Sequence, residues 1–300
     1  MTDDRQWYRG ENCNFFPSKE QNTESDALDK YYLNGWTPSN PIIHKDTMVT
    51  TFGSCFAALL RRYLEKRKVK QHQIKYKEIP IVYAAAGLNT TFTLRQQFEW
   101  AWENRKFDEV LWFTDQKEKV LVLEKHRDLT KEVFNQTDVF VITLGLSEVW
   151  YNKVTGDTFW RAIPKSQFDP NIHGFRISTV QENIDNLIKI LKLGEVHNPN
   201  AKWIFTLSPV ALKATFRPVG AVTANAVSKA ILRAAVDETI RNVDKGFFRL
   251  NENLFYWPSY EIAKEYMPDA YRDDNLHVNN RTINTIMKCF DRYFISKELR

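Results

Sequence analysis

Short apolar runs alternate with stretches of helical period from Met48 almost to the end of the chain. Three runs, 48–52, 139–144 and 203–207, consist almost entirely of apolar and β-branched residues, and each stops at a glycine or a serine. Strands without polar alternation are typical of a parallel sheet that is covered on both faces. We therefore predict that the three runs are neighbouring or near-neighbouring parallel strands of one sheet.

Helical spacing follows these strands. Apolar residues recur at i, i+3, i+4, i+7 and i+8 over 56–64, and a further helix is expected over about 179–193. Gly194 would then sit where a left-handed C-terminal cap is common. The order strand, helix, strand, helix with short joins predicts a single doubly wound α/β domain over 44–300, with a mostly parallel sheet flanked by helices.

Residues 1–43 differ from this pattern, because they are polar, irregular and spotted with aromatic side chains. Bulky rings argue against free disorder. We expect this segment to be an N-terminal arm that packs on the body.

Composition describes a soluble globular chain, since 43% of the 300 residues are hydrophobic and 26% are charged. The net charge of +5 comes without a long run of like charges, so nucleic acid is not an expected partner. No stretch is long and apolar enough for a membrane span. Cys13, Cys55 and Cys289 form neither a metal-ligand pattern nor a disulfide framework, and the histidines lack ligand spacing. We expect a cytoplasmic protein without a metal site, and its oligomeric state stays open.

The turn Gly53-Ser54-Cys55 is the first candidate for chemistry, because ligands of doubly wound sheets gather beyond the carboxyl ends of the strands. A helix that begins there presents free N–H groups and positive potential, which favour a thiolate and can stabilise an oxyanion. In the alternative interpretation, Gly53 only permits the turn and Cys55 is a small buried filler.

Asp274 and His277 form the second candidate, in a polar loop before the last helix. A carboxylate three residues before a histidine can hold one ring nitrogen and leave the other to act as a base. The alternative is a histidine that is simply solvated.

Glycine and polar residues after two further runs are the third candidate. Gly87 and Asn89 follow the run 79–86, and Gly145 and Ser147 follow the central run. Amides and an asparagine side chain at strand ends can line an oxyanion pocket, although loop glycines often mark turns alone.

Three basic residues, Lys213, Arg217 and Lys229, follow the strand 203–207. They could meet an anionic substrate or a carrier such as coenzyme A. A solvated face is the simpler interpretation, and we adopt it as the expectation.

Taken in order, the candidate residues resemble the block layout of the SGNH (GDSL-like) hydrolase superfamily. More closely, Gly53-Ser54-Cys55-Phe56-Ala57 matches the motif that gives the GSCFA domain family its name. The part of the chain that resembles this family runs from about residue 46 to residue 290. Further segments that resemble this family are 142–145, 206–210, Ser228-Lys229, 258–261 and Asp274 with His277.

The resemblance implies an SGNH-like, flavodoxin-like three-layer fold, with a nucleophile after the first strand that the late Asp274/His277 pair activates. Superfamily members usually read Gly-Asp-Ser, which puts Cys55 in the place of the serine and Ser54 in the place of the aspartate. Cys55 is the preferred nucleophile and Ser54 the alternative. Ser147 stands near the position where many members have an oxyanion-hole asparagine.

The implied activity is acyl-ester chemistry, as an esterase or as an O-acyltransferase, with acetyl as the expected group and a carbohydrate or similar hydroxylated molecule as the substrate. No cofactor is required, and a transferase could take its acyl group from acetyl-coenzyme A. The alternative function is a non-catalytic binding module or pseudo-enzyme of the same fold that assists a polysaccharide or secondary-metabolite pathway. A nucleotide-binding protein is disfavoured, because no glycine-rich phosphate loop follows a predicted strand.

Overall fold

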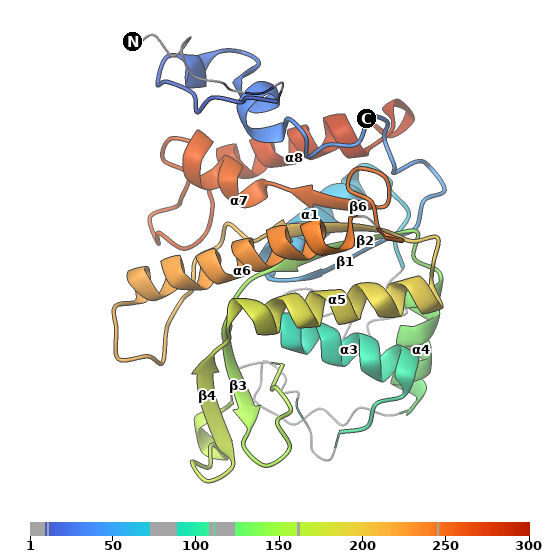
Figure 1. Cartoon of the computed structure of the whole chain (residues 1–300), viewed down its shortest axis with the longest axis vertical. Helices are drawn as coiled ribbons and strands as arrows, with labels where there is room; N and C mark the ends of the chain where they lie inside the picture. Colours follow the sequence, from blue (N-terminus) through green and yellow to red (C-terminus); the bar gives the residue numbers. More distant parts are fainter. Residues whose placement is uncertain are drawn as a thin grey trace.

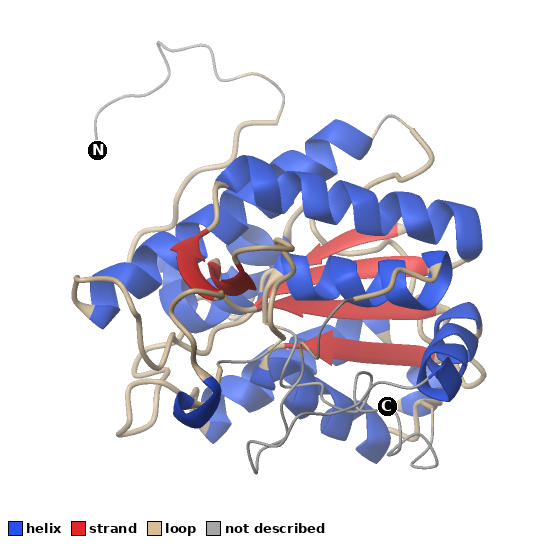
Figure 2. Ribbon diagram, turned by 90° about the horizontal axis from the view of Figure 1, so that it is seen from below, coloured by secondary structure: helices blue, strands red, loops and turns tan. Residues whose placement is uncertain are grey.

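A parallel sheet lies between two layers of helices in the computed structural model (Figures 1 and 2), which describes residues 10, 12–72, 89–107, 111, 124–160, 163–244 and 246–300. Neighbouring strands of the sheet pair in parallel, in the order β1-β2-β5-β6. The predicted parallel arrangement of the runs 48–52, 139–144 and 203–207 is confirmed. The strands are β1 (Val49–Gly53), β2 (Val139–Leu144), β5 (Lys202–Leu207) and β6 (Leu254–Trp257).

Helices connect and cover these strands, and none in the described part of the chain has both the length and the apolar character needed to cross a membrane. They are α1 (Cys55–Lys66), α3 (Thr91–Glu103), α4 (Glu124–Asn135), α5 (Val180–His197), α6 (Ala221–Val243), α7 (Ser259–Glu261) and α8 (Asn280–Phe294). Shorter 3₁₀ and π segments are η2 (Gln21–Thr23), η3 (Leu28–Leu33), η5 (Lys165–Gln167), η6 (Ile262–Tyr266) and η7 (Lys297–Leu299). An antiparallel pair, β3 (Glu148–Asn152) and β4 (His173–Ile177), extends away from the sheet (Figure 1).

Strand β2 shows why its sequence is apolar throughout. Val139 and Val141 belong to the apolar cluster that contains side chains of α1 and α8. Phe140 and Ile142 belong to the cluster on the other face, which contains side chains of α3, α4, α5 and α6. Both faces of the strand are therefore buried, and the three-layer α/β fold is as predicted.

Helix α5 corrects one expectation about its end. It continues to His197, three residues beyond Gly194, so Gly194 is not a left-handed cap. A Cβ atom at Gly194 would come within 2.3 Å of the Trp203 ring. The glycine is needed because α5 lies directly against strand β5.

The described part of the N-terminal segment packs against α8. Leu33 and Ile43 are buried in the same apolar cluster as α8, and the N–H of Ile43 donates to Phe294 O at 2.8 Å. The Asp29 carboxylate accepts from the hydroxyl of Tyr293 at 2.6 Å. These contacts attach the segment to the body, whereas the boundary near residue 43 stays a prediction.

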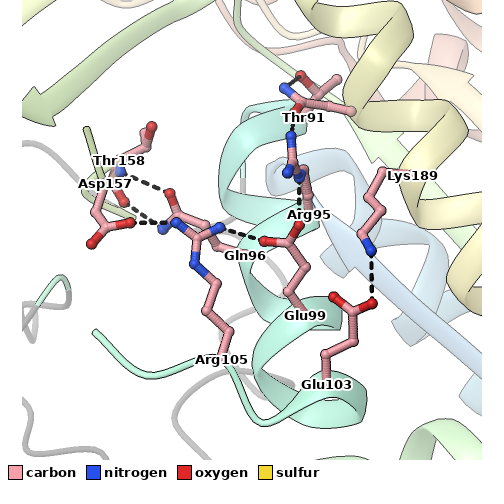
Figure 3. Close-up of polar contacts among 10 residues, drawn as sticks. Thr91, Arg95, Gln96, Glu99, Glu103, Arg105, Asp157, Thr158 and Lys189 are labelled. Atoms are coloured by element: carbon pink, nitrogen blue, oxygen red, sulfur yellow. Dashed lines mark hydrogen bonds and ion pairs between the residues drawn. The ribbon is translucent and has the colours of Figure 1, made fainter. Parts of the chain in front are cut away.

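A partly buried ion-pair network joins α3 to the loop that follows β3 (Figure 3). Glu99, only 4% exposed, accepts from Arg95 Nε at 2.6 Å and also from Arg105. The Arg105 guanidinium continues to Asp157 at 2.5 Å. Opposite charges therefore surround the buried carboxylate.

Candidate active site

A pocket of about 190 Å³ opens at the carboxyl ends of β1, β2 and β5. Ser54 and Cys55 line it after β1, Gly145 after β2, the segment 208–213 after β5, and His277 from the loop before α8. This is the place where a doubly wound sheet presents loop residues to a ligand.

The turn after β1 gives Ser54 and Cys55 different surroundings. Gly53 has a φ of 129°, and a Cβ there would lie 2.1 Å from Thr143 O, so only glycine fits. Ser54 is the N-cap of α1, and its Oγ accepts the N–H of Phe56 at 3.3 Å. It is 3% exposed, whereas Cys55, the first residue of the helix, is exposed. The alternative in which Cys55 is a buried filler is therefore wrong.

Asp274 and His277 make the contact that the sequence predicts. Asp274 Oδ2 lies 2.7 Å from His277 Nδ1, and Oδ1 accepts the N–H groups of Leu276 and His277 at 2.9 Å each. The N–H of His277, its ring and the N–H of Leu276 together hold the pKa of Asp274 well below its usual range. The carboxylate stays ionised and fixes the ring through Nδ1, which leaves Nε2 for proton transfer.

Hydrogen bonds to two other segments, at Asn89 and at Ser228, hold the loop after β2. Asn89 O accepts the N–H groups of Gly145 at 3.0 Å and Leu146 at 2.8 Å, so these amides are already engaged. Ser147 is fully buried, and its N–H donates to Ser228 Oγ at 2.9 Å. The loop is thus fixed before any ligand binds.

The structure brings together most of the predicted site residues. Those that line the pocket are Ser54, Cys55, Asn89, Gly145 and His277. Asp274 supports His277 from its other ring nitrogen, Ser147 is not among the lining residues of this pocket, and Gly87, like the run 79–86, lies outside the described residues. Among the described residues, no hydrogen bond joins Cys55 Sγ to the His277 ring. Catalytic contacts of this kind often form only when the substrate binds.

The basic residues that follow β5 differ in exposure. Lys213 is exposed and lines the pocket, whereas Lys229 is only 2% exposed. Lys229 Nζ donates to Gly145 O at 3.0 Å and to Ser208 O at 2.8 Å, and both of these residues line the pocket. The expectation of a solvated face is therefore wrong for Lys229, because α6 turns it toward the sheet.

A signal for this burial is present in the sequence of α6. Lys229 precedes Leu232, Val236 and Ile240 by three, seven and eleven residues, which places all four on one helix face. Burial lowers the pKa of Lys229 to about 7, and the charge of Cys55 acts in the opposite direction. A lysine on an apolar stripe is the pattern that sequence reasoning missed.

The GSCFA family model matches residues 48–290, which span the sheet, the Gly53-Ser54-Cys55 turn and the Asp274/His277 loop. The chain belongs to the GSCFA family. This membership agrees with the resemblance found in the sequence, and it covers every described residue of the pocket. The comparison with curated proteins finds no match.

Several solved structures are similar to this GSCFA domain. A GDSL-like lipase from Parabacteroides merdae has 13% identity and a TM-score of 0.43, covering 87% of this chain and 100% of that one. An acetyl esterase, solved as a serine-to-alanine mutant with an acetate ion, has 9% identity and a TM-score of 0.37 over 81% and 93% of the two chains. An acetyl xylan esterase from the rumen bacterium Butyrivibrio proteoclasticus has 13% identity and a TM-score of 0.35 over 85% and 63%. The family assignment rests on the family match alone.

Proposed function

We propose that this GSCFA domain performs acyl-ester chemistry at the pocket, with Cys55 as the nucleophile and His277 as the general base. One observation carries the proposal: an exposed thiol at a helix N-terminus and a histidine oriented by a carboxylate line the same small pocket, although they are far apart in the sequence. Nucleophile, base and orienting group are the parts that covalent acyl transfer needs.

The reaction would proceed in two steps. His277 Nε2 takes the proton from the Cys55 thiol as the sulfur attacks the carbonyl carbon of the ester. The tetrahedral intermediate then expels the alcohol, which receives that proton, and a thioester remains on Cys55. In the second step, water or a substrate hydroxyl attacks the thioester, His277 accepts its proton, and the thiol is restored when the acid or the new ester leaves.

The surroundings of the two candidate nucleophiles support Cys55 over Ser54. The Ser54 hydroxyl caps α1, and its removal would leave a helix N–H without its partner. Cys55 has an exposed side chain and lies at the N-terminus of a twelve-residue helix, where positive potential favours an anion.

Oxyanion stabilisation would come from Cys55 N–H and the Asn89 side chain. The first helical N–H groups have no partner within their own helix, and Cys55 is the first residue of α1. Asn89 lines the pocket, while its backbone oxygen already accepts Gly145 and Leu146. Gly145 therefore acts through its close approach to the turn, since a Cβ there would lie 3.2 Å from Ser54 Cβ.

The pocket favours a short acyl group. Its volume of about 190 Å³ lies below the range of drug-sized pockets, and Leu146, Val210 and Leu212 give it an apolar lining. An acetyl group carried on a carbohydrate or similar hydroxylated molecule fits these dimensions. Exposed Lys213 lies at the same pocket and could meet an anionic donor such as acetyl-coenzyme A.

The test is intact-protein mass spectrometry after exposure to p-nitrophenyl acetate and, separately, to acetyl-coenzyme A. We expect an acetyl adduct on the wild type that is lost in Cys55→Ala and retained at least in part in Ser54→Ala. Turnover of p-nitrophenyl acetate should fall by about three orders of magnitude or more in Cys55→Ala.

Each other result of this test has a different meaning. Loss of the adduct in Ser54→Ala together with full activity of Cys55→Ala would move the assignment to the serine. No adduct and no turnover in the wild type with either donor would favour the non-catalytic alternative. An adduct from acetyl-coenzyme A alone would identify a transferase.

A further inference from the structure

Lys229 is a buried cation that the proposed reaction does not use. It is 2% exposed, and its hydrogen-bond partners are two neutral carbonyl oxygens, Gly145 O at 3.0 Å and Ser208 O at 2.8 Å. Neutral acceptors do not cancel the cost of burying a charge. An apolar residue of similar length would pack on the same stripe of α6 without this cost, so packing alone does not account for the lysine.

The place of Lys229 connects it to the pocket. The ends of β2 and β5 are adjacent in the sheet, and the amine bridges the first residue after each strand. The preceding residue, Ser228, accepts the N–H of Ser147 at 2.9 Å. Two consecutive side chains of α6 therefore hold the loop after β2, one as a donor and one as an acceptor.

Cys55 is the described titratable group whose charge acts on Lys229. Of the charged groups nearby, Arg233 lies one turn further along α6 and is paired with Glu261 at 2.7 Å. Lys213 and His277 line the pocket from the other elements that form it. An ammonium group has three N–H donors, and carbonyl oxygens occupy two of those of Lys229.

We propose that Lys229 is a positioning residue for Cys55. The ammonium group of Lys229 fixes the loop after β2 and stabilises the negative charge that forms on the Cys55 sulfur. The interaction is reciprocal: a thiolate on Cys55 favours the protonated lysine, and the protonated lysine favours the thiolate. This role rests on the proposed function of Cys55. Lys229 is not among the residues that line the pocket, so it acts through Cys55 and the loop rather than on substrate.

The first experiment measures the alkylation rate of Cys55 by iodoacetamide between pH 5 and 9, read by peptide mass spectrometry. The rate follows the thiolate fraction, so removing a nearby positive charge should raise the pH of half-maximal rate. For Lys229→Met we expect an upward shift of about one pH unit and a rate about tenfold lower at pH 7. Lys229→Gln keeps an N–H donor without the charge and should show a similar shift.

Lys192→Met is the matched control, since it removes an exposed lysine from α5. Its alkylation profile should coincide with that of the wild type. Identical profiles for the wild type and both Lys229 variants would overturn the proposal. A loss of thermal stability without a shifted profile would assign Lys229 a purely structural role and overturn it as well.

The second experiment leaves Lys229 in place, in case its variants do not fold. The titration of Lys229 is followed by NMR at its Cε in the wild type and in Cys55→Ser. Because coupling is reciprocal, its midpoint should be lower in Cys55→Ser. An unchanged midpoint would overturn the proposal.

These results are distinguishable from a failure of the proposed function. The acetyl adduct is read on the wild type, whereas the role of Lys229 is read as a difference between variants. An adduct on Cys55 with unshifted profiles would retain the function and reject the role of Lys229. Shifted alkylation profiles without an acetyl adduct would retain the effect of Lys229 on the Cys55 thiol and reject the proposed acyl-ester function.

Discussion

Two buried ionisable side chains in this protein, Glu99 and Lys229, have different kinds of partner. Glu99 of α3 is surrounded by opposite charge, from Arg95 at 2.6 Å and from Arg105 (Figure 3). Lys229 of α6 has two neutral carbonyl partners. Both side chains are almost fully buried, at 4% and 2% exposure.

The difference sets the ion pairs of α3 apart from the surroundings of the lysine that we propose to act on Cys55. A carboxylate that accepts from two guanidinium groups links α3 to the chain that follows it, and through Arg105 to Asp157. An amine among neutral acceptors can be protonated or neutral near pH 7, because burial lowers the pKa of Lys229 to about 7. Uncompensated buried charges whose pKa is strongly shifted are typical of functional sites.

The largest effect should come from breaking the compensated pair. Glu99→Ala leaves the two arginines without their shared carboxylate, and we expect a loss of about 3 kcal/mol in the free energy of unfolding. Urea denaturation measures it. The rate of Cys55 alkylation should stay within about twofold of the wild type, and a tenfold change would show that the two regions are coupled.

The uncompensated lysine should appear in the pH dependence of stability. Its pKa is about 7 in the folded protein and about 10.5 in the unfolded chain, so the unfolded chain binds more protons between these values. The contribution of Lys229 to stability is therefore unfavourable below pH 7 and improves as the pH rises toward 10.5. Between pH 7 and 9 the wild type should gain about 2 kcal/mol relative to Lys229→Met. Parallel curves for the two proteins in urea titrations would contradict this.

The smallest effect should come from an exposed ion pair between α3 and α5. Lys189 pairs with Glu103 at 2.7 Å on the surface, where both side chains are about one-third exposed or more (Figure 3). Because water screens such pairs, Lys189→Met should change the free energy of unfolding by less than about 1 kcal/mol. A loss as large as that of Glu99→Ala would mean that an exposed pair stabilises the fold as much as the buried carboxylate does.

Much of the candidate site follows from local sequence signals. The turn after β1 needs a glycine because a backbone oxygen occupies the place of its Cβ, and Ser54 and Cys55 follow in the positions of an N-cap and a first helical residue. The contact between Asp274 and His277 spans three residues, so it too is local. Signals within a few residues can be interpreted without knowledge of the fold.

The sequence by itself therefore determined which apolar runs form buried strands, the turn with Cys55 and the Asp274/His277 pair, because each depends on neighbours along the chain. Only the tertiary structure decided that Gly194 faces Trp203 and that Lys229 lies under the loop after β2. A lysine carries the same local signal on a solvated face and on a buried one. Its burial depends on what packs against α6. Here that is the adjacent ends of β2 and β5, where Gly145 and Ser208, the first residues after the two strands, are brought together although they are far apart along the chain.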